Sequence, residues 1–352
     1  MDLIEFNKKV KETFPPFRNK HLSGNILEIT ENYLSEFYSL VSEIDDYIYG
    51  DITKNHILYK IKIQNDSILK AIKHFLAGEI IEYYITIYDT FFNSNLGLRN
   101  IYYKKFPEKI PFFRLRTNSP NKKFKNHEMF HIPFEEVRRT RNQRFSLSGH
   151  PSLYLGSSTY ICWEELSNPS LETCNFSVLR NEEEVVLFDL TPPSEIKKME
   201  DILRYPLIIS SSIKFTDNGF TFKPEYIIPQ AIYFSLLKFN KDLLAKEKEV
   251  NINKLDGIIY LSTHISHELL FSDLDLMCNY VFPVENIAER GYCERLKKLF
   301  SISEPKSIND LWLKFPHLFL EKTTYQEEYE LSIFNTIEKY ICGKTVFRSL
   351  ID

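Results

Sequence analysis

Arg144-Phe-Ser-Leu-Ser-Gly-His-Pro-Ser-Leu-Tyr154-Leu-Gly-Ser-Ser-Thr-Tyr-Ile-Cys-Trp-Glu-Glu165 is the stretch of sequence that decides the fold. Residues 148–151 have the composition of a turn. The alternation in residues 152–155 predicts a short strand in which the two leucines share one face and Tyr154 points to the other. We therefore expect a strand that presents a tyrosine on the face opposite to its leucines.

The second half of the same stretch predicts a helix. The small residues after the strand interrupt it, and Thr159 can cap a helix over residues 159–166. At ~100° per residue, Glu165 falls on the apolar side with Ile161, whereas Glu164 projects from the other flank. A carboxylate on an apolar face is unfavourable unless it has a partner. Glu165 is therefore either half of a structural Glu–Arg pair or a functional carboxylate.

Short β-like runs and helical patterns alternate around this stretch, over residues 111–300. Strands are expected over residues 112–116, 152–155, 184–190, 207–213, 257–262 and 276–282. Helices are expected over residues 159–166, 193–203 and 225–239. This succession predicts an α+β fold with a mixed or antiparallel sheet and flanking helices.

The two ends of the chain are predicted to be helical. In residues 1–103 apolar residues recur at three- and four-residue steps, first at Ile26, Ile29, Tyr33, Phe37, Leu40, Ile44 and Ile48, and again at Ile68, Ile72, Phe75, Ile80, Tyr83, Ile87 and Phe91. Asp66 or Ser67 is expected to cap a helix in this domain. Residues 104–110 form a basic linker with two prolines nearby, and residues 301–352 form a helical C-terminal extension.

Charge is unevenly distributed along the 352 residues. The net charge is −4, which does not indicate a polyanion-binding protein by bulk electrostatics. From Lys104 to Arg144, however, twelve Lys and Arg residues and four acidic residues give +8, so the remainder carries −12. This basic belt indicates either a bound phosphate or nucleic acid, or a solvated surface.

The five cysteines do not form a Cys-x-x-Cys pair, and an odd number argues against a disulfide framework. A reducing, cytoplasmic location fits this composition. Residues 1–12 mix charged and apolar residues, unlike a signal peptide. No run approaches the ~20 apolar residues that cross a bilayer, so no membrane association is expected.

The quoted stretch resembles the signature of the RES family, which is named for an Arg, a Glu and a Ser. Arg144, Tyr154 and Glu165 match its spacings of ten and eleven residues, and Ser262 supplies the third named residue. Further matching segments are Met129-Phe-His-Ile-Pro133, Tyr226-Ile-Ile-Pro-Gln230, Asp256-Gly-Ile-Ile-Tyr-Leu-Ser262 and Asn279-Tyr-Val-Phe282. Gln143 departs from the glycine of small toxin-type members. The resemblance covers roughly residues 111–285.

This resemblance implies an ADP-ribosyltransferase-like fold that cleaves NAD, with no metal. Toxin-type members hydrolyse or phosphorolyse NAD, or ADP-ribosylate a protein. Glu165 would stabilise the oxocarbenium-like transition state, because one carboxylate near the ribose offsets its positive charge. Arg144 is the first candidate to bind the pyrophosphate, with Arg114 or Arg116 second. Tyr154 would contact nicotinamide, and Ser262 would bind ribose, phosphate or Glu165.

Other functions stay open on the sequence alone. One is a catalytically silent RES-like binding module. Another is nucleic-acid binding by the basic belt, with stacking on Phe106, Phe112, Phe113, Phe124 and Phe130. A hydrolase triad or metal site from Ser262, His264, His267, Glu268, Asp273 and Asp275 has no supporting motif.

Two expectations concern partners and the N-terminal domain. An active enzyme would need an inhibitory partner, such as an antitoxin or immunity protein, because unrestrained NAD loss harms the cell that makes it. The N-terminal domain resembles the helical HEPN-type domains that are fused to some RES domains. Arg18 and His21 stand too close together for the HEPN nuclease motif, so this domain is expected to be a scaffold or to bind a partner.

Overall fold

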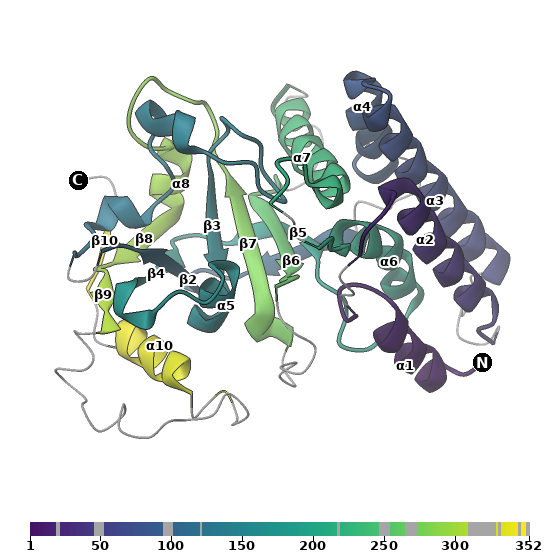
Figure 1. The fold of residues 1–352 in the computed structure, drawn as a ribbon, viewed down its shortest axis with the longest axis horizontal. Coiled ribbons are helices and arrows are strands. Elements are labelled where there is room, and N and C mark those ends of the chain that lie inside the picture. Colours follow the sequence, from purple (N-terminus) through teal and green to yellow (C-terminus); the bar gives the residue numbers. More distant parts are fainter. Residues whose placement is uncertain are drawn as a thin grey trace. The chain divides into compact units, whose positions relative to one another are not determined.

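A computed structural model describes residues 1–18, 22–45, 53–93, 101–119, 122–216, 219–245, 254–264, 274–308, 329, 332–343 and 346–349. The chain forms two compact units (Figure 1). Unit 1 comprises Met1–Lys104, Gln143–Ser146 and Leu187–Leu255, and unit 2 comprises Lys105–Asn142, Leu147–Val186 and Asp256–Asp352. The α+β fold class expected from the sequence is confirmed.

Unit 1 is helical. Its helices are α1 (Leu3–Thr13), α2 (Ile26–Ser42), α3 (Lys54–Leu76), α4 (Ile80–Phe91), α6 (Met199–Ser212) and α7 (Ile227–Ala245). Helix α3 packs against α2, α4, α6 and α7, so it lies at the centre of the unit. Stacked rings, such as Phe37 against Tyr205 with centroids 5.4 Å apart, join the N-terminal helices to α6. This packing explains why the unit extends beyond the expected domain over residues 1–103.

The apolar stripes of α2, α3 and α4 form the core expected from their spacing, with two corrections. The stripe that α2 buries runs through Ile26, Thr30, Leu34, Phe37 and Val41, which is rotated from the expected one. Helix α3 begins with its cap at Thr53, whose side chain accepts a hydrogen bond from the His56 backbone, so the expected caps at residues 66–67 lie inside the helix. Ile48 lies outside the described residues.

The largest error in the predicted elements concerns residues 207–213. They were expected to form a strand, but they form the second half of α6 and its C-cap. Leu207, Ile208 and Ile209 are fully buried there. A short apolar run has no polar face to reveal its period, so periodicity alone does not separate a buried helix from a buried strand.

The sheet has the strand order β1-β5-β6-β7-β3-β2-β4-β8-β10, with β9 beside β4. The strands are β1 (Tyr103–Phe106), β2 (Pro111–Thr117), β3 (Ser152–Gly156), β4 (Cys174–Asn181), β5 (Val185–Leu190), β6 (Gly257–Leu261), β7 (Cys278–Pro283), β8 (Phe300–Ser303), β9 (Lys306–Ser307) and β10 (Phe347–Ser349). Strands β1 and β5 have residues in both units. The neighbouring pairs from β6 through β7, β3, β2, β4 and β8 to β10 are antiparallel.

Two segments of unit 2 differ from the expected domain boundaries. The predicted linker, residues 104–110, contains most of β1 and a turn at Lys109, whose φ is 66°. The predicted helical extension, residues 301–352, contributes β9, β10 and most of β8 in addition to α10 (Ile333–Gly343). Helix α8 (Glu294–Leu299) precedes β8. The strands in both segments have too few residues to show an alternating pattern.

Strand β3 and helix α5 (Thr159–Glu165) confirm the arrangement expected from the quoted stretch. Leu153 and Leu155 of β3 are buried, whereas Tyr154 is half-buried. The helix cap is Ser158, one residue before the expected one, and its side chain accepts from the Ile161 backbone. Gly156 is required for this packing, because a Cβ there would lie 2.7 Å from Cys162 Sγ. The missing side chain lets α5 lie directly on the sheet.

Candidate active site

Glu165 is the centre of the candidate site, at the C-terminal end of α5. Its Oε1 accepts a hydrogen bond from Ser262 Oγ at 2.5 Å and a second from Asn279 Nδ2 at 2.5 Å. Ser262 is 2% exposed and Asn279 is 5% exposed, whereas the Glu165 side chain is 28% exposed. Two buried donors on one oxygen hold the carboxylate in a fixed orientation.

The sheet register explains why these residues meet. Asn279 of β7 lies opposite Gly156 of β3 and opposite Tyr260 of β6. Cross-strand neighbours point to the same face, which here is the face that α5 covers. Ser262 follows Tyr260 by two residues, and Tyr154 precedes Gly156 by two, so alternation places both on this face. The structure thus brings Ser262 to Glu165 and places Tyr154 on their face of the sheet.

The second oxygen of Glu165 has a different environment. Oε2 lies 3.7 Å from His264 Nε2 and has no hydrogen-bond partner among the described residues. The His264 backbone N–H donates to Ser262 Oγ at 3.1 Å, so the same hydroxyl fixes the turn that carries the imidazole. The carboxylate therefore has one oxygen held by the protein and one that a ligand can reach.

Helix α5 is held in place by Glu338 of α10. Glu338 Oε1 accepts from the Thr159 backbone N–H at 2.6 Å, from the Thr159 hydroxyl at 3.0 Å and from the Tyr329 hydroxyl. Burial raises the pKa of Glu338. A carboxylate at the first turn of a helix satisfies backbone N–H groups that the helix leaves unpaired. The C-terminal helix thus supports the helix that carries Glu165.

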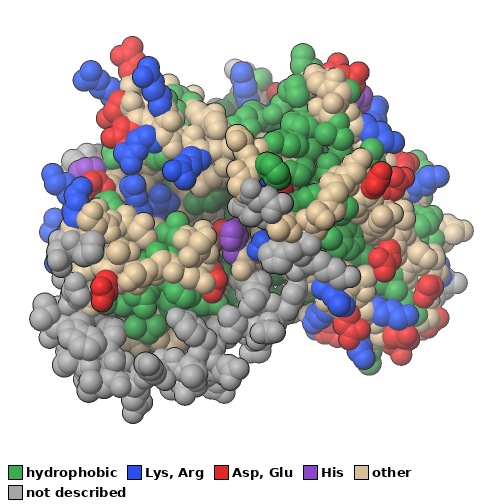
Figure 2. Space-filling view, in the orientation of Figure 1, with side chains coloured by type: hydrophobic (Ala, Val, Ile, Leu, Met, Phe, Trp, Pro, Cys, Tyr) green, Lys and Arg blue, Asp and Glu red, His purple; other side chains and the backbone are tan. Residues whose placement is uncertain are grey.

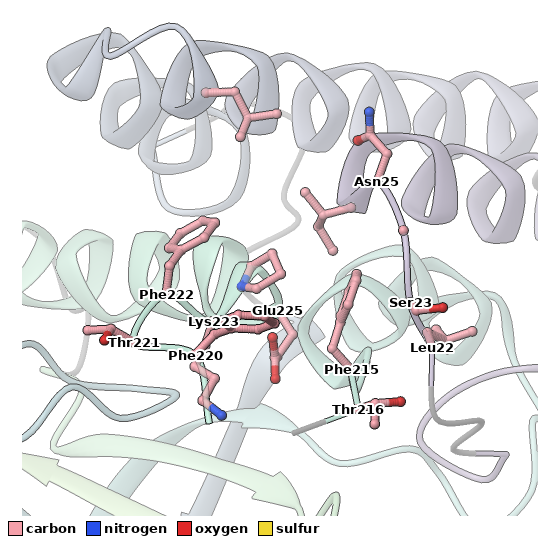
Figure 3. A pocket seen from close by; sticks show the side chains of 14 residues that line it. Leu22, Ser23, Asn25, Phe215, Thr216, Phe220, Thr221, Phe222, Lys223 and Glu225 are labelled. Carbon is pink, nitrogen blue, oxygen red and sulfur yellow. The ribbon is translucent and has the colours of Figure 1, made fainter. Parts of the chain in front are cut away.

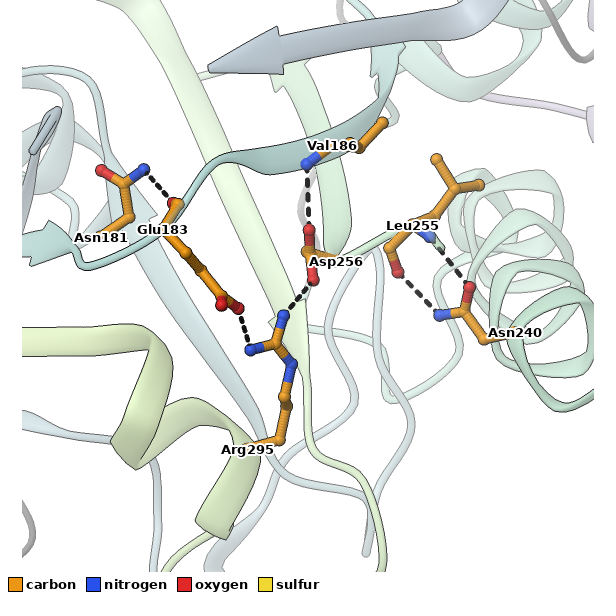
Figure 4. Close-up of polar contacts among 7 residues, drawn as sticks. All are labelled: Asn181, Glu183, Val186, Asn240, Leu255, Asp256 and Arg295. Carbon is orange, nitrogen blue, oxygen red and sulfur yellow. Dashed lines mark hydrogen bonds and ion pairs between the residues drawn. The ribbon is translucent and has the colours of Figure 1, made fainter. Parts of the chain in front are cut away.

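A second network fixes β6, the strand that leads to Ser262 (Figure 4). Asp256 Oδ2 accepts from the Val186 backbone N–H at 2.9 Å, and Asp256 Oδ1 accepts from Arg295 Nη2 at 2.9 Å. Arg295 also pairs with Glu183, whose backbone carbonyl accepts from Asn181 Nδ2 at 2.8 Å. These contacts determine where β6 begins, and so they position the serine that follows its end.

Arg114 has a structural role in this arrangement. Strands β2 and β3 pair only at Phe113 and Gly156, so by alternation Arg114 lies on the face opposite to α5. Its Nη1 donates to the Tyr154 carbonyl, and its Nη2 donates to the Phe130 carbonyl at 3.2 Å. Burial, with a contribution from Arg116, lowers its pKa to about 10. Arg114 therefore closes the gap where the two strands diverge.

Arg116 shares the face of Arg114, as expected, and lines a separate pocket of about 450 Å³. The lining residues are Arg116, Ile132, Pro133, Glu136, Arg138, Arg139 and Arg141. Figure 2 shows Lys and Arg side chains gathered at the upper left, on unit 2. The Arg139 guanidinium pairs with Glu136, and Arg116 lies over the Phe124 ring, 5.1 Å from its centroid. The pocket is strongly cationic.

Arg144 belongs to unit 1 and is 9% exposed. Its Nη1 donates to the Ser211 carbonyl at 2.9 Å and to the Ile213 carbonyl at 3.1 Å, at the C-terminal end of α6. Its guanidinium carbon lies 5.4 Å from the centroid of the Tyr226 ring. A cation is favourable at this end of a helix. The expected convergence of Arg144 with the Glu165 cluster stays a prediction.

The structure identifies site residues that the sequence did not single out as functional. Asn279 stands in a segment predicted as a strand, and only the register reveals that it faces Glu165. His264, a candidate for a hydrolase triad on the sequence alone, lies beside the Glu165 carboxylate. His267, Glu268 and Asp273 lie outside the described residues. Within the described ranges, no three His, Cys, Asp or Glu side chains are grouped as metal ligands.

Most of the phenylalanine rings that were expected to stack on nucleic-acid bases are buried. Phe112, Phe113 and Phe130 are buried, with exposures of 0%, 5% and 1%. A buried ring cannot present its face to a base, so the basic belt keeps only its electrostatic attraction for a polyanion. In the part of the chain that the structure describes, no helix is both long and apolar enough to cross a membrane.

The fold and the cluster define an α+β protein whose candidate active site is a hydrogen-bonded carboxylate. No family model matches the chain, and no solved structure matches it. The chain is similar to the protein of Bacillus subtilis (strain 168) named "Putative toxin YopC", with 36% identity over 213 residues. The match covers 55% of this chain and 45% of that protein, so the chain spans less than half of that relative's length.

Proposed function

We propose that this chain cleaves the nicotinamide–ribose bond of NAD, with Glu165 as the catalytic carboxylate. The observation that carries the proposal is that the two oxygens of Glu165 have different surroundings. Ser262 and Asn279 hold Oε1, while Oε2 is left for a ligand beside His264. A negatively charged group that is fixed before the reaction stabilises a developing positive charge without reorganisation.

The chemistry needs few groups from the protein. The C1′–N bond breaks with its electron pair leaving on the nicotinamide nitrogen, which is a pyridinium in NAD and departs neutral. No general acid is required. The ribose C1′ becomes oxocarbenium-like, and Glu165 Oε2 offsets its charge. With water as the acceptor, the products are nicotinamide, ADP-ribose and one proton. Tyr154, on the same sheet face, offers a flat ring for nicotinamide.

The resemblance to RES domains and the toxin name of the B. subtilis relative support the same proposal. The proposal also includes an ADP-ribosyltransferase-like core, a toxin or defence role, and action in the cytoplasm. Because depletion of NAD damages the producing cell, the proposal includes an inhibitory partner protein of the antitoxin or immunity type. The acceptor, whether water, phosphate or a protein side chain, is decided by what else reaches C1′.

The test is direct. Purified full-length chain is incubated with NAD, and free nicotinamide is followed by chromatography, with and without added phosphate. The proposal expects nicotinamide release that rises with protein concentration, and ADP-ribose or its phosphate as co-product. Absence of release under all conditions, including added acceptor proteins, would favour a silent binding module instead.

A second candidate function rests on the cationic pocket. Arg116, Arg138 and Arg141, with Arg139, surround about 450 Å³ and suit a phosphate-bearing polyanion. A single-stranded oligonucleotide is the test ligand. Binding that falls steeply between about 50 and 200 mM salt and is lost in an Arg138→Ala/Arg141→Ala variant would support it. Nicotinamide release that this variant leaves unchanged would separate the two functions.

A further inference from the structure

Unit 1 contains a cavity of about 810 Å³ that the proposed NAD chemistry does not use. It lies between the start of α2, the end of α3 and the segment that leads into α7 (Figure 3). Backbone hydrogen bonds shape one side, because the Leu22 N–H donates to the Lys214 carbonyl at 3.3 Å and the Thr216 N–H donates to the Leu22 carbonyl at 2.9 Å. The cavity is therefore bounded by fixed backbone as well as by side chains.

Apolar side chains line much of this cavity and are unusually exposed. Phe220 is 68% exposed, and Phe222 and Leu76 are each 52% exposed. Phe222 nevertheless has a fixed position, since its ring stacks on Phe75 with centroids 6.0 Å apart and planes 6° from parallel. Exposed aromatic surface in a concave site costs free energy until an apolar group covers it. The cavity thus favours a ligand with an apolar body.

One carboxylate stands among these apolar groups. Glu225 is only 7% exposed, and its Oε2 is shielded from solvent without a hydrogen-bond partner. Lys223 also lines the cavity, but among the described residues no Lys, Arg or His forms an ion pair with Glu225. In Figure 3 the Glu225 carboxylate points away from the ring of Phe222, and the Phe215 side chain lies to its right. A buried carboxylate oxygen without a donor is unfavourable. Oε1 of Glu225 is not shielded in this way, so a donor that arrives with a ligand can reach the carboxylate there.

Glu225 also lies next to the N-terminal end of a helix. It belongs to the short turn Pro224–Tyr226 directly before α7. The N-terminal end of a helix carries a partial positive charge that favours an anion. This field lowers the cost of the buried charge, but it supplies no hydrogen bond to Oε2. A helix-terminal role alone therefore leaves that oxygen unexplained.

We propose that this cavity binds a small organic cation, with an aromatic or alkyl body against Phe215, Phe220 and Phe222 and a protonated amine that donates to Glu225. The volume suits a drug-sized molecule, for which pockets are typically about 300–1,000 Å³. A few fixed polar groups in an apolar pocket set orientation and specificity. This site lies within the helical unit and is independent of NAD cleavage by Glu165.

The test uses three probes that share one apolar body: 4-phenylbutylamine, 4-phenylbutanol and 4-phenylbutyrate. Binding to the full-length chain is measured by calorimetry near neutral pH. The amine should bind about tenfold or more tightly than the alcohol, since one charge-assisted hydrogen bond accounts for at least that ratio. The carboxylate should bind most weakly. Equal affinities for the three probes, or no binding of the amine, would overturn the proposal.

Variants assign the site. Glu225→Gln keeps the shape and removes the charge, so it should abolish the preference for the amine while the alcohol binds as before. Thr221→Trp adds a ring at an exposed lining position and should block all three probes without unfolding the chain. Glu31→Gln, at an exposed position of α2, is the matched control and should leave the binding of all three probes unchanged. Unaltered amine binding in Glu225→Gln, or self-association of the chain that Thr221→Trp abolishes, would contradict a small-cation site.

Discussion

Ser262 Oγ lies 2.5 Å from Glu165 Oε1, although 97 residues separate the two along the chain. The serine also accepts from the His264 backbone N–H, and the glutamate also accepts from Asn279. The hydroxyl thus joins the end of β6 to the end of α5. It acts on the proposed reaction by orienting the carboxylate and the imidazole-bearing turn.

Ser262→Ala should lower the rate of nicotinamide release by on the order of tenfold, because Glu165 loses one of its two donors while Asn279 keeps the other. The free energy of unfolding should fall by only about 1 kcal/mol. Steady-state kinetics and urea unfolding measure the two effects. Ser170→Ala, at an exposed position after α5, is the control. A variant that retains the full rate would show that the hydroxyl does not orient Glu165.

Asn279→Asp should lower the rate of nicotinamide release more than Asn279→Ser does. The new carboxylate would replace a donor that lies 2.5 Å from Glu165 Oε1 and would put a like charge beside it. Asn279→Ser weakens the donor contact without adding a charge. Steady-state kinetics compares the two variants at one pH. Equal rates would count against a role for the charge of Glu165 in the reaction.

Arg114→Met should destabilise the chain more than Arg116→Met does. Loss of Arg114 leaves the Tyr154 and Phe130 carbonyls without their buried donor, which costs on the order of 2–4 kcal/mol. Arg116 lines an open pocket and donates to one backbone carbonyl, that of Glu128, so its loss should cost less. Thermal unfolding of the two variants compares them under identical conditions. Equal melting temperatures would indicate that Arg114 is available to a ligand rather than committed to the backbone.

Stability should fall as the pH drops from about 6.5 toward 4. The buried His131 donates from Nδ1 to the Ile132 carbonyl at 2.7 Å and accepts from the Cys293 N–H at Nε2, so it is neutral. Burial lowers its pKa to about 4. The unfolded chain therefore binds more protons in this window, and folding loses at most about 3 kcal/mol there. Urea unfolding at several pH values measures the slope, and His131→Gln should flatten it.

The local sequence was sufficient for the parts of the site that lie close together. Turn composition and helical geometry predict the break at Gly156, the start of a helix near Thr159 and the direction of Glu165. The structure confirms the predicted strand and helix. Glu164 and Glu165 were distinguished on angle alone. Hydrogen bonds to Ser262 and Asn279 form at Glu165, as its inward direction suggested.

Long-range pairing could not be obtained from the same reasoning. Asn279 reaches Glu165 only because β7 lies between β3 and β6 in one particular register. Nothing in the local pattern of β4, whose eight residues are nearly all buried, marks it as a strand. The helical unit extends beyond the expected residues 1–103 for a related reason. Helices α6 and α7 join it through packing with α2, α3 and α4, which sequence order conceals.

The most direct test of the central claim compares nicotinamide release by Glu165→Gln and Glu164→Gln. The amide retains the shape of Glu165 but removes the charge that offsets the oxocarbenium ion, so the rate should fall by on the order of 10²–10³ while the melting temperature is maintained. Glu164 has no hydrogen bond or ion pair from its side chain within the described residues, so its variant should be close to wild type. Full activity of Glu165→Gln, or an equal loss in both variants, would contradict the account.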